Sequence, residues 1–577
     1  MMMAAQATEY FVDAETGRDG NSGLSAGEAW QTVRRVNLAA LKPGDTVRFK
    51  AGGTWRESLL CQSGEEGQPI TYTSYGDGPK PVLLASVDLA AEASWVDLGE
   101  RIWVTAKDEI TARRAFPEFA PGDWGIYCDG DGLATMSAAT NDQGEKVYTL
   151  RGQKTGQRST NIQLNYIGIP LEPEQYIRYR FRAKATKPFA IQSVSLMRAQ
   201  NPWGGYGTEM ARSTDIGAEW GEHEVMFRTT ISEPATDGRL SFFIGDKLPE
   251  DCEFSFVPLG AELLDYRSLG LTDDVGNIIL VAKDGTEKTA AWKRWDRESL
   301  KSQGDFFHDP ADKRLYFYSE RNPAATYSMM EAARKRIIVR FGSTRHAVVD
   351  GFTIAYSGAH GANGGGCQHG IIRNCDFLWI GGSHLYTRND RPTRYGNGVE
   401  FWNGCENMTV ENNYFEEVYD TAMTNQGPGE GLLKNMVWRN NRTFRCEQAY
   451  EIWFSNADMV VDGLLVTGSE FVDSGYGWSH AQRPDKRGCH LLGYGLTCKI
   501  VDIRYDHNIF RNAKDAPIWF SNARLAEFKI DHNTYIQPGA DASTKLFRWV
   551  GIDREGVTFD EYRKLTGNDA HSTLQGE

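Results

Sequence analysis

Three acidic residues in the second half of the chain are spaced as a catalytic carboxylate cluster would be. Glu400, Asp420 and Glu451 lie in the segments GVEFW, EVYDTAM and YEIWFSNA. Two carboxyl groups roughly 5–9 Å apart can cleave a glycosidic bond, one as general acid and the other as nucleophile or base. We predict that Asp420 and Glu451 form the working pair. Glu400 is the predicted third carboxylate, and His490 is predicted to position the substrate or to tune Glu451.

Three tryptophans are predicted to line the same surface. The hexapeptide IWFSNA occurs at 452–457 and again at 518–523, and a tryptophan stands second in each copy. Flat apolar rings on a solvated surface are costly unless they bind something, and they suit sugar rings. Trp402, Trp453 and Trp519 are therefore predicted substrate contacts, with burial under neighbouring loops as the alternative.

Two long segments interrupt the chain on either side of the Asp420 and Glu451 region, at about 379–397 and 472–488. Long loops on a rigid scaffold often carry function. Two walls around a carboxylate floor favour a pocket, attack at glycan chain ends and, given their basic residues, an anionic sugar. The predicted substrate-binding residues in these loops are Arg391, Arg394, Trp478, His480 and Arg483.

A repeat must place these side chains. From Val348 onward a short strand-like pattern closes on an aromatic residue, and the steps between successive aromatics are 38, 29, 27, 39 and 25 residues. Short strands that cannot bury a face alone stack into a parallel β-solenoid. The closing aromatics are Phe377, Phe415, Phe444, Phe471, Phe510 and Tyr535.

Counting forward from each aromatic predicts a register for one strand of every coil. Met423, Ile452 and Ile518 fall on the inward side, because neighbouring strand residues alternate between faces. Two outward columns flank them. The first column reads Glu400, Ala422, Glu451, His490 and Pro517, and the second reads Trp402, Thr424, Trp453, Leu492 and Trp519.

Residues 119–267 have a sequence pattern different from that of the solenoid repeat. Alternating strands such as YIRYRFRAKA and HEVMFRTTI, separated by turn residues, are typical of an antiparallel β-sandwich. Exposed aromatics in NPWGGYG, Trp203 and Tyr206, could stack on a sugar. The predicted organisation is a β-helix cap with the first coils at 1–118, the sandwich at 119–267, active-site coils at 268–557, and a capping helix with tail at 558–577.

The opening YFVDAETGRDGNSGLSAGEAWQTVRRVN and the later GDFFHDPADKRLYFYSERNPAA resemble bacterial right-handed parallel β-helix enzymes that act on polysaccharides. That group includes glycoside hydrolases of the fucosidase and xylosidase kind, and the resemblance covers roughly 8–90 and 268–570. The insert resembles jelly-roll carbohydrate-binding modules, which can carry a structural calcium ion. The resemblance implies an all-β protein, a right-handed parallel β-helix with an inserted jelly roll, and glycoside hydrolase activity. The paired aspartates with GHG and RIK that mark polygalacturonases are absent.

The amino-acid composition argues against several classes of binding partner. A net charge of −14 argues against nucleic acid. No apolar run is long enough to cross a membrane. The nine cysteines form neither a disulfide framework nor a zinc motif. We therefore expect a polysaccharide or oligosaccharide partner, no metal or other cofactor at the catalytic site, and a secreted or periplasmic location with the signal removed.

Two other functions stay open. A polysaccharide lyase or epimerase acting on a uronic-acid polymer would need a cation and a base, which His480, His490, Arg483 and Lys486 could supply. A carbohydrate-binding β-helix without catalysis would bind glycan and release no product.

Overall fold

The computed structural model describes residues 7–116, 119, 123–173, 175–231, 234–520, 523–549 and 553–576. The chain divides into two compact units. The larger combines Met1–Lys107 with Leu269–Glu577, and the smaller is Asp108–Ser268. Ser521 and Asn522 of the second IWFSNA copy lie outside the described residues.

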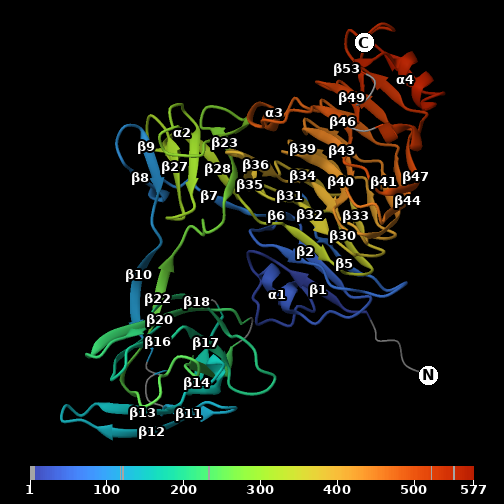
Figure 1. The fold of residues 1–577 in the computed structure, drawn as a ribbon. Coiled ribbons are helices and arrows are strands. Elements are labelled where there is room, and N and C mark those ends of the chain that lie inside the picture. Colours follow the sequence, from blue (N-terminus) through green and yellow to red (C-terminus); the bar gives the residue numbers. More distant parts are fainter. Residues whose placement is uncertain are drawn as a thin grey trace, which may run out of the picture. The chain divides into compact units, whose positions relative to one another are not determined.

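Three ten-stranded sheets build the larger unit, and successive coils add one strand to each (Figure 1). Pairing along the stack is parallel except at β53, which closes sheet C in antiparallel fashion. Sheet A is β1 (Glu9–Val12), β2 (Thr46–Lys50), β5 (Ile70–Tyr75), β30 (Ala347–Asp350), β33 (Ile371–Arg373), β38 (Thr409–Glu411), β41 (Gly431–Arg439), β44 (Met459–Thr467), β47 (Lys499–Asp506) and β50 (Lys529–Asp531). Sheet B is β3 (Thr54–Trp55), β6 (Val82–Leu84), β31 (Thr353–Ala355), β34 (Asp376–Leu378), β39 (Tyr414–Glu416), β42 (Arg442–Phe444), β45 (Glu470–Val472), β48 (Ile509–Arg511), β51 (Thr534–Ile536) and β54 (Thr573–Gln575). Sheet C is β4 (Leu59–Leu60), β29 (Val339–Gly342), β32 (Ala362–Gly364), β37 (Val399–Phe401), β40 (Thr421–Gly427), β43 (Gln448–Phe454), β46 (Cys489–Tyr494), β49 (Ala516–Phe520), β52 (Phe547–Trp549) and β53 (Asp553–Val557).

The corner between sheets A and B explains the repeated sequence pattern. From β38 onward the residue before the inward polar position has a positive φ, as at Asn412 and Asn440, where asparagine tolerates the left-handed region. The next residue turns inward and bonds to the coil beside it: Asn413 N–H donates to Asn441 Oδ1 at 3.0 Å, and Asn441 N–H donates to Ser469 Oγ at 3.1 Å. This ladder satisfies buried backbone groups where no strand pairing can.

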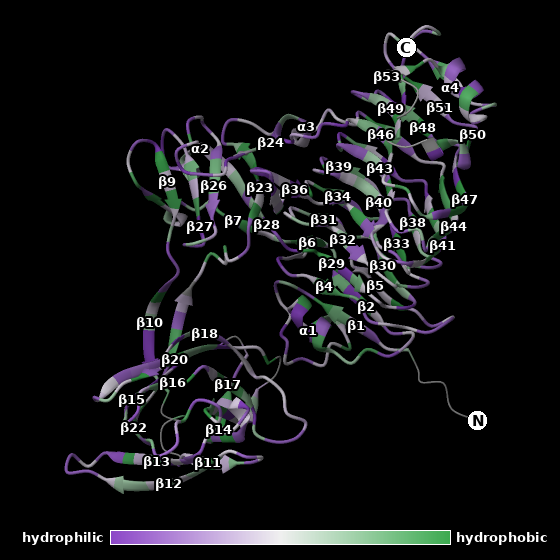
Figure 2. Ribbon diagram, in the orientation of Figure 1, coloured by the Kyte–Doolittle hydropathy of each residue, from purple (hydrophilic) through white to green (hydrophobic). Residues whose placement is uncertain are grey.

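The stacked aromatics confirm the predicted solenoid and correct one of its positions. Phe377 pairs with Phe415, but Phe415 pairs with Thr443, and Phe444 falls one residue beyond the column. The threonine occupies the inward place that the spacing assigned to an aromatic. Hydrophobic and hydrophilic residues are mixed along these strands, as expected when one side of each faces the core (Figure 2).

The register of sheet C differs from the prediction by two residues in the coils of β37 and β43. Met423, Ile452 and Ile518 are fully buried in the solenoid core, as predicted. Ile518 pairs with Leu491 as predicted, but Met423 pairs with Val399 and Tyr450 rather than with Phe401 and Ile452. A two-residue shift keeps every side chain on its face and changes its neighbours. The predicted columns are therefore wrong, and the outward column reads Glu400, Thr424, Glu451, Leu492 and Trp519.

All three long insertions enter at the corner between sheets B and C. Residues 85–338 separate β6 from β29, a hairpin formed by β35 (Ser383–Arg388) and β36 (Arg391–Tyr395) separates β34 from β37, and α3 (Trp478–Gln482) lies between β45 and β46. Extra chain at a corner leaves the hydrogen-bonded stack intact. One edge of the solenoid thereby gains walls that the other corners lack.

The prediction that stacked coils begin at residue 268 is wrong. Residues 275–334 form mostly antiparallel strands, with β25 and β26 paired in parallel, and the stack resumes at β29, because these strands pair with near neighbours or with 86–105. They belong to two small sheets of the larger unit. The first sheet is β24 (Lys288–Ala290), β23 (Val275–Ala282), β28 (Tyr327–Arg334) and β7 (Ser86–Asp88), and the second is β25 (Trp292–Lys293), β26 (Asp305–Asp309), β27 (Arg314–Tyr318), β9 (Ile102–Thr105) and β8 (Trp95–Asp97).

The smaller unit is an antiparallel sandwich around its own core, as predicted. It begins at Asp108, ahead of the predicted boundary at 119, because β10 (Glu109–Ala115) pairs with β22. One sheet is β12 (Leu133–Thr140), β13 (Lys146–Lys154), β22 (Glu253–Arg267), β15 (Tyr176–Ala185), β20 (Gly221–Thr229) and β18 (Gly207–Ser213), and the other is β11 (Gly125–Cys128), β14 (Ile162–Leu171), β21 (Ala235–Phe243) and β17 (Ser193–Arg198), with the pair β16 (Phe189–Ala190) and β19 (Asp215–Ile216) beside them.

Helices are short and sit at the ends of the stack or at its insertions. Near the C-terminus, α4 (Phe559–Thr566) starts at Thr558, whose side chain accepts from Glu561 N–H while Glu561 reaches back, forming a capping box. Phe559 and Tyr562 of this helix pack on the last coil, against Phe547. The remaining helices are α1 (Val33–Leu38) and α2 (Pro323–Thr326), with 3₁₀ turns at Ala26–Glu28, Glu92–Ser94, Ser159–Asn161 and Ala523–Glu527.

Candidate active site

The candidate site lies where sheet B turns into sheet C. Asp420 is the residue before β40, and Glu400 and Glu451 are in β37 and β43. The register places Thr424 between the two glutamates in one outward column, so their Cα atoms are roughly 9–10 Å apart at ~4.8 Å per coil. The three predicted carboxylates therefore come from three successive coils. Their charges act on one another, since Asp420 and Glu400 both influence Glu451.

Glu451 is buried and touches only neutral hydrogen-bond donors. Its side chain faces away from the solenoid core, and the residue is 4% exposed. Thr421 Oγ1 lies 3.3 Å from Oε2, and Tyr494 Oη lies 3.3 Å from Oε1. Burial, followed by the charge of Asp420, raises the pKa of Glu451 to about 8. Glu451 therefore holds its proton at neutral pH.

Asp420 differs because it has a cationic partner. Arg483 donates to Asp420 Oδ1 at 2.9 Å and to the Tyr419 carbonyl at 3.1 Å, and its other nitrogens reach Asp485 at 3.1 Å. Burial raises the pKa of Asp420 above its ordinary value, while Arg483 opposes that shift. Arg483 bonds directly to Asp420, whereas it acts on Glu451 only through its charge, so the Asp420 anion is the better stabilised of the two.

Glu400 accepts hydrogen bonds from three neighbours. Asn397 donates to its Oε2 at 2.6 Å, Gln426 donates to the same oxygen at 2.8 Å, and Trp402 Nε1 donates to Oε1. His360 Nδ1 lies 3.3 Å from Oε2 and accepts the Asn397 N–H at 3.1 Å. A carboxylate with this many donors is fixed in place, so Glu400 is suited to orienting groups and shaping the local field.

His490 corrects the sequence prediction. It was expected to face outward beside Glu451, but it is fully buried against Phe471 and Phe510, with Nδ1 2.8 Å from Ser474 Oγ. The chain bends where it enters sheet C, and at the equivalent position Ala422 and Met423 both join the core. Strict alternation fails at this bend. Burial lowers the pKa of His490 to about 3, so the ring is neutral.

The three tryptophans do not share one column. Trp402 and Trp453 lie two residues beyond Glu400 and Glu451 along their strands, whereas Trp519 pairs with Leu492, in the glutamate column. Trp453 stacks on Tyr494 with centroids 6.2 Å apart, and Trp519 lies between the guanidinium groups of Arg487 and Arg548, at 5.7 and 4.9 Å. All three are partly exposed. Their predicted role in binding substrate stays a prediction.

Most of the predicted loop residues hold the loops together. Arg394 is buried, donates to the Gly382 and Gly276 carbonyls and to Gln482, and lies over the rings of Tyr419 and Trp478. It thereby ties the β35–β36 hairpin to α3 and β23.

The side chains of Trp478 and His480 are also bonded to neighbouring residues of the fold, whereas that of Arg391 forms no such bond among the described residues. Trp478 Nε1 donates to the Glu417 carbonyl at 3.0 Å, and His480 Nδ1 lies 3.2 Å from both oxygens of Glu447. Arg391 is exposed at the hairpin tip. Of the five predicted loop residues, Arg483 alone touches one of the three carboxylates in the part of the chain described.

Sequence reasoning missed several residues of the site. His360, Asn397, Thr421 and Tyr494 contact the carboxylates directly, and Thr424 between the glutamates has a buried hydroxyl without a partner among the described residues. One signal was available: His360 and Asn397 lie at the sheet B to C corner, as Asp420 does. Reading every coil at that corner would have found both.

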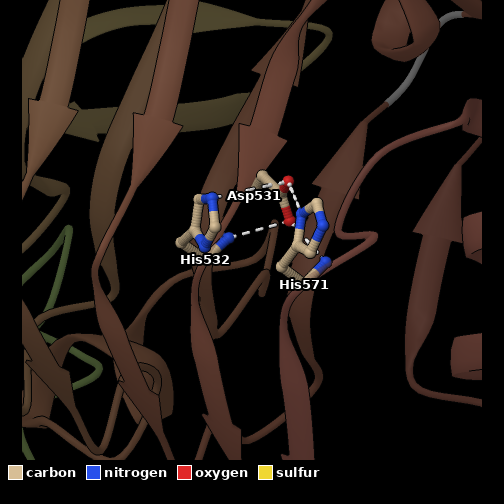
Figure 3. Close-up of side chains that lie close together, drawn as sticks. All are labelled: Asp531, His532 and His571. Atoms are coloured by element: carbon tan, nitrogen blue, oxygen red, sulfur yellow. Dashed lines mark hydrogen bonds and ion pairs between the residues drawn. The ribbon is translucent and has the colours of Figure 1, made fainter.

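One group of three metal-ligating side chains is found among the described residues, at the last coils and separate from the carboxylates (Figure 3). His571 Nδ1 lies 2.7 Å from Asp531 Oδ2, and His532 Nε2 lies 3.9 Å from the same oxygen. The His532 and His571 rings stack 4.9 Å apart. Burial raises the pKa of Asp531, but the hydrogen bonds from His571 and His532 together lower it to about 2, so the three side chains are held by one another.

Known proteins give little guidance. No protein-family model and no curated protein matches the chain. Similar solved structures include a glycoside hydrolase (TM-score 0.36, 11% identity, 97% of this chain and 100% of that one) and the GH136 lacto-N-biosidase from Eubacterium ramulus (0.33, 9%, 99% and 68%). A family 11 carbohydrate-binding module from Clostridium thermocellum matches 28% of this chain and 95% of its own (0.17, 12%). Likeness at this level supports no functional assignment, so function is argued from the site.

Proposed function

We propose that the protein is a glycoside hydrolase in which Glu451 is the general acid and Asp420 the nucleophile or general base. One observation carries this proposal: two carboxyl groups on adjacent coils, Glu451 buried and Asp420 partly exposed, have opposite surroundings. Glu451 meets only neutral hydroxyl groups, whereas Asp420 is paired with Arg483. Environments that push two acidities apart assign the roles of acid and base.

The chemical step uses these two states. Glu451 transfers its proton to the glycosidic oxygen, and the bond from that oxygen to the anomeric carbon breaks. Asp420 either attacks the anomeric carbon itself or removes a proton from the water that does. In both routes Glu451 is left as an anion. Tyr494 can stabilise this anion by donating to Oε1, because burial raises the pKa of the phenol and keeps it protonated.

The surroundings of the basic residues favour hydrolysis over uronate elimination. A lyase needs a cation free to bind the uronate and a base free to take a proton. Arg483 is bound to Asp420 and Asp485, His480 is bound to Glu447, and His490 is in the core. Of the four predicted lyase residues, only Lys486 is exposed and without an ion pair among the described residues. An external glycan as substrate also fits the expected secreted or periplasmic location.

A glycan-panel digestion tests the proposal. The wild type should release reducing ends from at least one glycan, without the ultraviolet-absorbing unsaturated sugar that a lyase makes. Proton NMR of the first product would show whether the anomeric configuration is kept or inverted. Unsaturated product, or hydrolysis unaffected by Glu451→Gln and Asp420→Asn, would refute the assignment.

We also propose that the sandwich unit binds glycan through one face. A depression of about 690 Å³ lies over strands of its four-stranded sheet. Trp203 and Tyr127 line it and are 59% and 52% exposed. Buried Arg239 lies under Trp203 at 4.9 Å, and its Nε has no partner within the described structure. Tyr206, the other predicted contact, instead donates to Asp237 at 2.9 Å.

Removing the Trp203 ring tests this role. In a glycan array with the full-length protein, Trp203→Ala should weaken the strongest signals severalfold, since a stacked aromatic contributes on the order of 1 kcal/mol. Trp220→Ala, at another exposed indole of the same unit, is the matched control. Unchanged binding for Trp203→Ala would exclude this face.

A further inference from the structure

A cavity in the larger unit lies between the 275–334 insertion and the β35–β36 hairpin. It has a volume of about 740 Å³ and contains none of the three carboxylates discussed above. Titratable and aromatic side chains dominate its wall. Six of its lining residues carry the argument: Lys293, Trp295, Lys313, Lys335, His384 and Asp390.

The charges of Lys293 and Asp274 at the floor of this cavity already neutralise each other. Lys293 Nζ lies 2.7 Å from both oxygens of Asp274 and 2.7 Å from the Val275 carbonyl. Burial lowers the pKa of this ammonium to about 8, against the opposing effect of Asp274. All three of its donors are used. Lys293 therefore holds the strands together and does not itself bind a ligand.

The rim keeps a surplus of positive charge. Arg294 and Asp309 also line the cavity, but each is paired with a residue outside the lining, Asp305 at 2.8 Å and Arg297 at 2.9 Å. Within the described ranges, Lys313 and Lys335 form no ion pair. Asp390 is the one lining carboxylate in the same condition. Two ammonium groups thus face one carboxylate, which favours an anionic ligand.

Trp295 supplies a flat apolar surface next to these charges. Its indole is 40% exposed, and two neighbours fix its orientation. Lys293 Nζ lies 5.1 Å from the ring centroid, and the His384 ring meets it edge-on at 5.5 Å. His384 is itself anchored, since its ring Nε2 lies 2.9 Å from Thr387 Oγ1 and its backbone N–H donates to Asp274 Oδ2 at 2.7 Å. A fixed aromatic beside cations suits a sugar ring that carries a negative group.

A short series of contacts links the cavity to the carboxylate site. Lys335 Nζ lies 5.5 Å from the centroid of the Tyr395 ring, and that ring packs edge-on against His360 at 5.1 Å. His360 touches Glu400 at 3.3 Å. Burial, then the charges of Glu400 and Asp274, raise the pKa of Tyr395 to about 12, so the phenol senses both sites. The hairpin that carries Tyr395 also carries His384 and Asp390, so one loop serves both.

We propose that this cavity is a subsite for a saccharide residue bearing an anionic substituent, a carboxylate or a sulfate, with Lys335 and Lys313 at the charge and Trp295 under the ring. That the bound residue belongs to the glycan cleaved at Asp420 and Glu451 rests on the proposed function. The predicted anionic specificity is thereby moved from the loop arginines to the lysines of this cavity.

Calorimetric titration of the full-length Glu451→Gln protein tests the subsite without turnover. The probes are oligogalacturonates, their neutral methyl esters, and sulfated galactan oligosaccharides of matched length. An anionic probe should bind at least about tenfold more tightly than the ester, since hydrogen bonds to charged groups are the stronger kind. The preferred anion distinguishes carboxylate from sulfate. Added salt should weaken the preference.

Three further substitutions locate the binding. Lys335→Gln should abolish most of the preference for charge, and Trp295→Ala should weaken charged and neutral probes alike. Lys564→Gln, at an exposed lysine on α4, is the matched control and should change nothing. Equal affinity for acid and ester, no binding of any anionic probe, or a Lys335→Gln protein that behaves like its parent would each overturn the proposal. Anion binding without glycan cleavage by the wild type would refute the hydrolase alone, and cleavage insensitive to Lys335→Gln would refute the subsite alone.

Discussion

Two corners of the same solenoid have opposite polar chemistry. At the corner between sheets A and B, one inward polar residue recurs in coil after coil and bonds to the next, as Asn413 does to Asn441. At the corner between sheets B and C, His360, Asn397 and Asp420 follow one another with no repeated type. Both corners pair backbone groups between coils, since Asn397 N–H donates to His360 Nδ1 and Thr421 N–H donates to Asn397 Oδ1. The second corner also brings together carboxyl groups whose charges conflict.

The difference separates structural from functional polarity. A residue type repeated in every coil repairs a defect that every coil shares, namely backbone groups left unpaired at a turn. A residue type found in one coil has no such reason. Carboxylates that lie close together repel one another and destabilise the fold. Destabilising groups of this kind are concentrated at functional sites. Insertions enter at this second corner, where extra chain can enclose such a group.

Glu451→Gln should break the functional corner with the largest effect. The amide keeps the shape but cannot donate a proton to the leaving oxygen, so turnover should fall at least ~10²-fold, the usual scale for general acid catalysis. Stability at neutral pH should hold or rise, because the folded protein keeps Glu451 protonated while the unfolded chain ionises it, and glutamine removes that difference. Steady-state kinetics with a chemical-denaturation curve measures both. Turnover within threefold of the wild type would contradict the assignment.

Asn441→Ala should do the reverse. The substitution removes the acceptor of Asn413 N–H and the donor to the Val410 carbonyl, leaving buried groups unpaired. We expect a loss of about 2–4 kcal/mol in the free energy of unfolding, from roughly 1–3 kcal/mol per unsatisfied group. Turnover per folded molecule should stay near normal. Urea denaturation measures the loss, and Asn403→Ala, which removes an exposed hydrogen bond from the side-chain amide to the Glu430 carbonyl, is the control.

The pH dependence of stability should sharpen the comparison. The pKa of Glu451 is raised by burial from 4.5 to about 8, so between those values the folded protein keeps a proton that the unfolded chain has released. The free energy of unfolding should therefore fall as the pH rises through this window and level off above it. Below pH 4.5 both states are protonated, and Glu451 contributes nothing.

Glu451→Gln should flatten much of that slope, while Asn441→Ala should lower the whole curve and leave the slope unchanged. Denaturation at several pH values between 4.5 and 8 decides this. Turnover of the wild type should also decline above about pH 8, as the general acid loses its proton. A slope equal in the wild type and in Glu451→Gln would show that another group binds this proton.

The sequence predicts the solenoid well because its signal is repeated. Strand-closing aromatics and inward positions such as Ile452 and Ile518 recur at every coil, so one error changes little. Register is less secure, since Phe444 looks like its counterparts while Thr443 takes the inward place. The strands at 275–334 cannot be distinguished from solenoid coils by sequence, because a short strand has the same local pattern in a parallel and in an antiparallel sheet.

The sequence predicts only part of the candidate active site, because it indicates which face a residue lies on but not the exact register. Glu400, Asp420 and Glu451 were found from face alone, which a two-residue shift preserves. His490 was misplaced because alternation fails at the bend, and Tyr494 was missed because its neighbours depend on the true register. His360 and Asn397 lie before their strands, at a corner whose geometry no periodicity describes.

The smallest effect concerns the repeated hexapeptide. Trp453 stacks on Tyr494, whose hydroxyl touches Glu451, whereas Trp519 lies between two arginines in a neighbouring position of the sheet. If Trp453 supports a sugar at the catalytic coil, Trp453→Ala should raise KM about three- to tenfold, as expected for one stacked aromatic, and change kcat less. Trp519→Ala should change KM less than twofold. The same residue in the same six-letter context would then matter in one coil and not in the other, because coil position and not local sequence places it near the carboxylates. Equal effects of the two substitutions would show that the substrate extends along both coils, and a larger effect of Trp519→Ala would mean that the glycan approaches from the C-terminal end of the stack.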